Sequence, residues 1–184
     1  MAIYTNLKLV DSKTHGIFER SRIKSSIVGR IYDLLVKDDV GTEIDVDNGV
    51  LLKVGEFTKN GLQEREATIA KDGDKVAISG SPAVVKDAFT FEQSQVYNYY
   101  NKAGKPLKAY ELVPEDIFGI ASYQFTSGDV KVDSYVTVDG NGGYVATDVK
   151  PADTYGFIGR IHSISTGTYY KIVRVEVIKN EQVA

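Results

Sequence analysis

Short runs of β-branched and aromatic residues alternate with turn signals along most of this 184-residue chain, and this rhythm most limits how it can fold. Asp47-Asn48-Gly49 precedes one such run, Lys59-Asn60-Gly61 follows it, and Asp72-Gly73-Asp74 separates the next two. Asn-Gly and Asp-Gly pairs tolerate positive φ and are typical of hairpin turns. Strands spaced by about ten residues favour a sandwich or barrel over a parallel α/β sheet.

The same rhythm continues through the second half of the chain. It predicts strands over 108–113, 116–122 and 135–138, a glycine-rich turn over 139–143, and a closing hairpin of 155–164 with 169–178. The earlier run 27–36 fits either a buried strand or a short helix, and Gly29 favours the strand. We therefore predict a mainly β protein with a small barrel-like or sandwich-like body, of which the closing hairpin is the best-buried part.

One helix is expected to interrupt the strands, over about residues 91–102. Thr90 and Gln93 have the spacing of a capping box, in which each side chain satisfies an amide at the start of the helix. Apolar and aromatic residues then recur at intervals of three and four. Gly104 and Pro106 supply the stop signal.

Charge divides the chain unevenly. Residues 1–30 contain six basic and two acidic side chains, a balance of +4, whereas the whole chain has a net charge of −3. We interpret residues 1–27 as an extended basic arm, a frayed and solvated terminus being the alternative. The remainder is expected to form a β-rich domain with one helix, 28–127, and a hairpin-rich lobe, 128–184, either separate or part of the same domain. The candidate partner-contact residues of the arm are Lys13, Arg20, Arg22 and Lys24.

Composition excludes several classes of protein. The chain is 42% hydrophobic and 26% charged, as globular domains are, and it has no cysteine for disulfides, thiol catalysis or thiolate metal sites. No apolar run approaches the roughly 18 residues of a membrane span, and none follows Met1. We expect a soluble protein without an export signal or a membrane partner.

The sequence contains no complete motif for catalysis, metal binding or nucleic-acid binding. His15 and His162 stand far apart without metal-ligand spacing, and Glu64 and Glu66 suit a solvated strand face. Residues 45–49 lack the remaining ligands of a calcium loop, and 140–143 lack the lysine of a P-loop. The basic residues at 20–24 have no interleaved aromatic on which a base could stack. We expect no enzyme activity, no cofactor, no metal and no nucleic acid.

Tyrosine is the contact residue that this chain has in excess, with twelve tyrosines against no tryptophan and two histidines. Tyrosine is enriched at protein interfaces because its ring is apolar and its hydroxyl is polar. The candidate interface aromatics are Tyr144, Tyr155, Tyr169 and Tyr170. The same rings would stack on sugars in a carbohydrate-binding or adhesin-like module, and a hydrolase on a β scaffold is a third, weaker hypothesis.

Three segments together resemble a known family. They are "DNGVLLKVG" at 47–55, "NKAGKPLKAYELVPEDIFGI" at 101–120 and "GFIGRIHSISTGTYYKIVRVEVI" at 156–178. In this order they resemble capsid-associated structural proteins of the head decoration type, from tailed phages of Gram-positive bacteria. The resemblance covers about residues 47–178 and carries no functional residue across.

What the resemblance implies agrees with the composition. Such a protein is mostly β and non-enzymatic, lies on the phage head surface after synthesis in the host cytoplasm, and binds the major capsid protein. A homo-oligomer is expected, with a trimer at a lattice symmetry axis favoured. The basic arm would lie on a neighbouring acidic surface, and the tyrosines would fill the contacts. The alternative that stays open is a glycan-binding β module of a phage fibre or tail.

Overall fold

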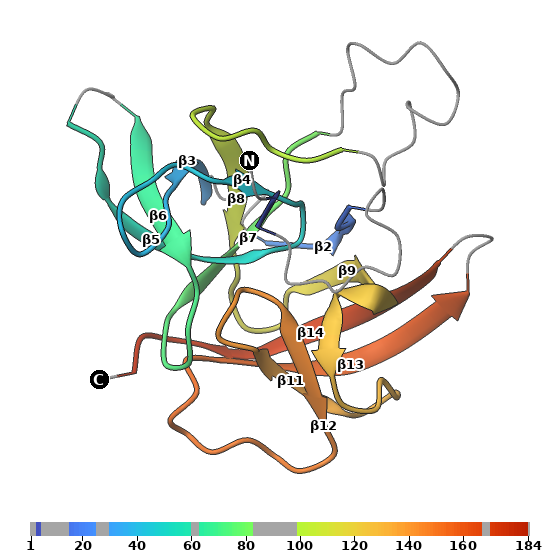
Figure 1. Cartoon of the computed structure of the whole chain (residues 1–184). Coiled ribbons are helices and arrows are strands. Elements are labelled where there is room, and N and C mark those ends of the chain that lie inside the picture. The colour runs from blue at the N-terminus through green and yellow to red at the C-terminus, as the bar shows by residue number, and fades with distance from the viewer. Residues whose placement is uncertain are drawn as a thin grey trace, which may run out of the picture.

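The computed structural model describes residues 3–4, 15–24, 30–59, 63–82, 99–166 and 170–183, and this part of the chain is mainly β (Figure 1). The predicted fold class is therefore confirmed. The strands form a closed barrel, a larger sheet, and a small parallel pair of β1 (Ile3–Tyr4) with β4 (Asp45–Val46). Helical structure in the described residues is confined to a 3₁₀ helix, Ser122–Gln124.

The barrel is built from the first half of the chain. Its strands in spatial order are β3 (Ile31–Val36), β6 (Glu64–Ile69), β5 (Leu51–Phe57), β7 (Val76–Ser79) and β8 (Leu107–Glu111). Antiparallel pairing joins the neighbours except at β3 and β6, which run parallel. Leu34, Leu52 and Ala109 fill the interior because alternate residues of a strand point to the same face.

The larger sheet takes its strands from both ends of the chain. In spatial order they are β10 (Phe125–Ser127), β12 (Tyr144–Thr147), β11 (Tyr135–Val138), β13 (Phe157–Thr166), β14 (Lys171–Asn180), β9 (Ile117–Ala121) and β2 (Phe18–Arg22). The long β13–β14 hairpin crosses the lower half of Figure 1. Val173, Val175 and Val177 of β14 face the core at alternate positions, as the sequence pattern predicts.

One hydrophobic cluster joins the barrel to the sheet, besides the cluster inside the barrel. Leu51 and Ile78 of the barrel pack in the same buried cluster as Phe118, Phe157 and Val175 of the sheet. This arrangement agrees with the alternative in which residues 128–184 belong to the same domain, and not with a separate lobe. Strands β9 and β10 belong to the same sheet as β11 to β14, so the backbone hydrogen bonds of the sheet cross the expected boundary between residues 127 and 128.

For residues 15–24 the prediction of an extended, solvated arm is wrong. Strand β2 is hydrogen-bonded to β9 at the sheet edge, and Ile17 and Ile23 on either side of it are buried. Arg20 in its middle and Arg22 at its end are exposed, and exposed charges are one way in which natural sheets protect an edge strand from further pairing. A charged edge strand and a solvated arm are both rich in basic residues, so composition does not distinguish them.

The turn at residues 47–49 ties the barrel to the sheet. Gly49 adopts φ +80°, as its position after Asn48 predicts. Asn48 exchanges two hydrogen bonds with the backbone of Ser81, at 2.9 and 3.0 Å. From the sheet side, the Tyr144 hydroxyl donates to the Gly49 carbonyl at 2.7 Å and Gln124 Nε2 donates to the Asn48 carbonyl at 3.1 Å. The local conformation of this turn therefore positions its backbone carbonyls to accept hydrogen bonds from residues far away in the sequence.

The expected helix over 91–102 is not helical at residues 99–102, the part of it that the structure describes. Residues 91–98 lie outside the described residues. At its end, the Asn101 amide donates to the Val46 carbonyl at 2.8 Å, and the Asn101 carbonyl accepts from the Val46 amide at 2.9 Å. Tertiary pairing with Val46 therefore satisfies the backbone groups that a helix would have used.

Candidate functional site

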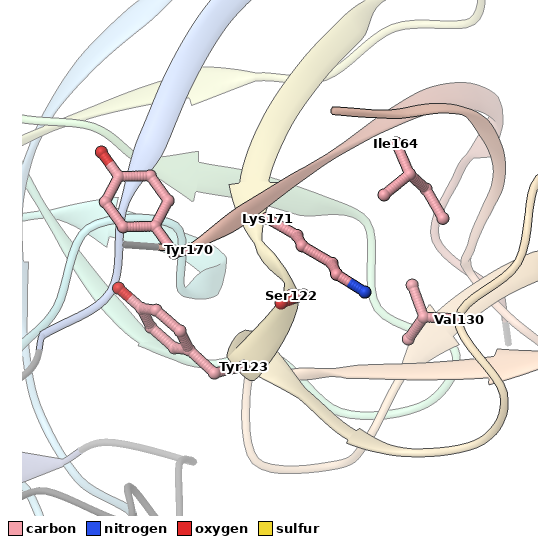
Figure 2. A pocket seen from close by; sticks show the side chains of 6 residues that line it. All are labelled: Ser122, Tyr123, Val130, Ile164, Tyr170 and Lys171. Carbon is pink, nitrogen blue, oxygen red and sulfur yellow. The ribbon is translucent and has the colours of Figure 1, made fainter. Parts of the chain in front are cut away.

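A pocket of about 400 Å³ opens where the β13–β14 hairpin passes the 3₁₀ helix (Figure 2). Its walls consist of Ser122, Tyr123, Val130, Ile164, Tyr170 and Lys171. In Figure 2 the rings of Tyr123 and Tyr170 lie on one side, and the Lys171 ammonium extends toward Val130 and Ile164 on the other. The pocket thus offers aromatic, aliphatic and cationic surface within the size range of ligand sites, roughly 300–1,000 Å³.

Gln124 fixes the 3₁₀ helix that carries Tyr123. Its Oε1 accepts hydrogen bonds from the amides of Ile17, at 2.9 Å, and Ala121, at 3.0 Å. Because Gln124 is buried, losing either donor would leave polar atoms unsatisfied. The position of Tyr123 therefore depends on a segment more than 100 residues away in sequence.

Tyr123 is anchored at its hydroxyl as well. The hydroxyl donates to the His15 carbonyl at 2.9 Å. Burial raises the pKa of Tyr123 well above its usual value, and the neighbouring Tyr170 and Asp47 raise it further. The group therefore remains a neutral donor, and this wall of the pocket is formed before any ligand arrives.

Tyr170 supplies the less constrained wall. It is half-buried, immediately precedes β14, and packs with Tyr123 against a small cluster that contains Ile172. Its hydroxyl makes no hydrogen bond to any residue that the structure describes, so it can meet a ligand or partner. Lys171 beside it is exposed and adds a positive charge.

The four tyrosines predicted at an interface do not form one surface. Tyr144 is fully buried in the shared core and was wrongly assigned, because its hydroxyl finds an internal acceptor at Gly49. Tyr155 is half-buried and lies just before β13, at the end of the β13–β14 ladder opposite to Tyr170. Tyr169 lies outside the described residues. Of the three candidates that the structure describes, only Tyr170 lines the pocket, and sequence reasoning missed its partner Tyr123.

The basic candidates are dispersed as well. Arg20 donates to the Tyr110 hydroxyl at 3.1 Å and its guanidinium lies over the Tyr110 ring. Lys24 is paired with Glu115 at 2.6 Å, whereas Arg22 is exposed. Lys13 lies outside the described residues. Two of the three basic side chains that can be placed therefore bind this chain itself.

His15 forms a buried pair with Asp47. Its Nδ1 lies 2.9 Å from Asp47 Oδ1, and Asp47 Oδ2 accepts the Gly16 amide at 3.0 Å. The His15 ring also contacts that of Tyr100, at 4.9 Å between centroids. These contacts pin residues 15–17 to the 47–49 turn, whereas His162 is exposed on β13. Within the described ranges, no three or more His, Cys, Asp or Glu side chains gather as metal ligands would.

None of the helical structure that can be described has the length and apolarity needed to cross a membrane. Comparisons with protein-family models, curated proteins and solved structures give no match to the chain.

Proposed function

We propose that this chain is a non-enzymatic structural protein of a bacteriophage head, of the accessory or decoration type, which binds the lattice of the major capsid protein. The observation that carries the proposal is the pocket of Tyr123, Tyr170 and Lys171, whose Tyr123 wall is held in place by hydrogen bonds to the rest of the β fold. Aromatic rings beside one charge are typical of the residues that dominate protein interfaces. The resemblance of three segments to decoration-type proteins supports the same function.

In this proposal a segment of the capsid protein enters the pocket. Its apolar side chains contact the Tyr123 and Tyr170 rings and the Val130–Ile164 wall, and an acidic side chain pairs with Lys171. The bound protein lies on the outer surface of the head as a homo-oligomer, with a trimer matching a symmetry axis of the lattice. Analytical ultracentrifugation of the free protein tests the oligomer part.

Co-sedimentation with assembled shells of a tailed-phage major capsid protein tests the binding. We expect saturable binding at a fixed ratio to capsid subunits. Tyr170→Ser should weaken it about tenfold or more, because truncation at a desolvated aromatic anchor costs about 2 kcal/mol. Lys171→Glu should weaken it most at low salt, because exposed charges are screened within about 10 Å at 0.1 M salt.

Tyr155→Ser is the matched control, since this half-buried tyrosine lies at the other end of the same ladder. It should bind as the unmodified chain does. Absence of saturable binding, or equal losses in Tyr170→Ser and Tyr155→Ser, would contradict the proposal.

Glycan binding is the second candidate, because the unbonded Tyr170 hydroxyl and two adjacent rings also suit a sugar. Titration with host cell-wall glycans, followed by NMR shifts of residues 122–123 and 170–171, separates the two functions. Shifts with glycans and no capsid binding would favour the glycan-binding module.

A further inference from the structure

A second pocket, of about 240 Å³, lies at one end of the barrel. All five barrel strands reach it through residues on or next to them. Its walls consist of Tyr32, Lys53, Val54, Arg65, Lys75, Val76, Ala77, Glu111 and Gln182. Three cationic side chains and one carboxylate line it.

Most of these charges are already paired. Lys75 Nζ lies 2.6 Å from Glu111 Oε1, and Lys53 Nζ lies 2.7 Å from Asp74 Oδ1. Arg65 differs from both. No described carboxylate lies within ion-pair distance of it, and its Nε is buried without a hydrogen-bond partner.

Aromatic rings hold the Arg65 guanidinium in place. The guanidinium carbon lies 4.9 Å from the Phe57 ring centroid and 5.6 Å from that of Tyr32. Rings on the guanidinium faces favour the cation but accept none of its hydrogen bonds. The two Nη groups, which unlike Nε are not buried, make no hydrogen bond to any described residue and are thus left for a ligand. A guanidinium binds carboxylate or phosphate through two parallel bonds.

Tyr32 lines the pocket as an uncharged side chain, and its single hydroxyl donor is used by Glu111. Its hydroxyl donates to Glu111 Oε2 at 2.5 Å. Burial and the hydrogen bond to Glu111 raise the pKa of Tyr32 to about 12. Tyr32 therefore stays neutral near pH 7 and, with Lys75, holds the Glu111 carboxylate in place.

We propose that this pocket binds a small oxyanion, either inorganic phosphate or a carboxylate group. Arg65 is its main donor, because the guanidinium charge is not paired with any described carboxylate, whereas Lys53 and Lys75 are paired with Asp74 and Glu111. The small volume restricts the ligand to a group of this size or to the acidic end of a larger molecule. The inference stands independently of the proposed capsid binding.

NMR titration of the full chain tests the site, with the Arg65 Nε–H resonance as the probe. Sodium phosphate and sodium acetate are added separately at constant ionic strength set with sodium chloride. We expect a saturable shift of this resonance with at least one of them and none with chloride. Saturation by phosphate alone identifies a phosphate site, and saturation by acetate identifies a carboxylate site.

Arg65→Lys should keep the ring contacts in part but weaken binding about tenfold or more, because an ammonium cannot form the paired bonds of a guanidinium. For this variant the backbone amides of residues 64–66 report binding. Arg160→Lys is the control, since Arg160 is an exposed arginine paired with Asp133. No saturable shift with either anion, or equal affinity in Arg65→Lys, would overturn the proposal.

Discussion

Three donors converge on the nearly buried carboxylate of Glu111, which is only 8% exposed. Tyr32 donates at 2.5 Å and Lys75 at 2.6 Å, and the Arg30 guanidinium lies 3.5 Å away. Burial by itself raises the pKa of Glu111. The hydrogen bonds from Lys75 and Tyr32, with the charges of Lys75 and Arg30, outweigh burial and hold this pKa below its usual 4.5.

This lowered pKa makes the contribution of Glu111 to stability depend on pH. A carboxyl group whose pKa is lower in the folded state stabilises the fold above its unfolded pKa and loses that effect as pH falls through the folded value. We expect Glu111→Gln to be less stable than the unmodified chain at pH 7, and this difference to shrink below about pH 4.5. Urea unfolding at pH 7, 5, 4 and 3 measures it.

Glu115→Gln serves as the control for this titration. Lys24 also lowers the pKa of Glu115, but this carboxylate is exposed and its ion pair is screened by solvent. Its removal should change stability little at any pH. A stability difference for Glu111→Gln that stays constant from pH 7 to 3 would contradict the assignment.

Among the elements, the turn after β10 shows how closely backbones approach in the sheet. Gly128 has φ +88°, and a Cβ there would lie only 1.8 Å from the Ala146 carbonyl oxygen of β12. Gly140, with φ +79°, has open space around its Cβ position. Both positions strain any L side chain, but only Gly128 also meets backbone.

We therefore expect Gly128→Ala to destabilise the fold by about 2 kcal/mol more than Gly140→Ala, because a forced backbone shift costs about 1–3 kcal/mol. Gly140→Ala should cost about 1–2 kcal/mol through its left-handed conformation. Thermal and urea unfolding of the two variants measures the difference. Equal losses would show that β10 and β12 do not approach as described.

For the molecule as a whole, Asn180 joins the sheet to the barrel. Its side chain accepts from the Val76 amide and donates to the carbonyls of Val76 and Leu112, each at 2.7 Å. Asn180 is the last residue of β14, whereas Val76 begins β7. These bonds lie beside the hydrophobic core that both units share.

Asn180→Ala should lower the free energy of unfolding by about 2–4 kcal/mol, because it leaves buried backbone groups without partners. Barrel and sheet should lose stability together in one cooperative transition, since their core is continuous. Hydrogen exchange of amides in β5 and in β13 measures the two units separately. Asn141→Ala, at an exposed turn, is the control and should change neither. Separate transitions for β5 and β13 would contradict a single cooperative unit.

Several elements could be predicted from the sequence because their signals are local. The turn glycines Gly49, Gly73 and Gly140 all have positive φ, and the run 135–138 coincides with β11. The closing hairpin was also predicted, and three valines of its second strand are buried at alternate positions. Turn preferences and the alternation of apolar side chains depend only on residues a few positions apart, so they can be recognised from the sequence.

The candidate site could be predicted only in part. Tyr170 was identified as a contact residue, but Tyr123 was not, and Tyr144 was placed on the surface although it is buried. A tyrosine in an apolar run suits a core as well as an interface. Its exposure depends on whether its hydroxyl finds an internal acceptor, and that acceptor for Tyr144 is 95 residues away.

The order of residues along the chain is enough to predict a mainly β protein and the positions of several turns, and to exclude cysteine chemistry. Three features appear only in the folded chain: β2 joins β9, a hydrophobic cluster joins barrel and sheet, and the Arg65 guanidinium lies over two rings beside a pocket. The physical reason is the distance along the chain over which each interaction acts. Turns and strands follow from torsional and burial preferences of neighbouring residues, whereas strand pairing, burial of polar groups and pocket formation depend on contacts between segments far apart in the chain.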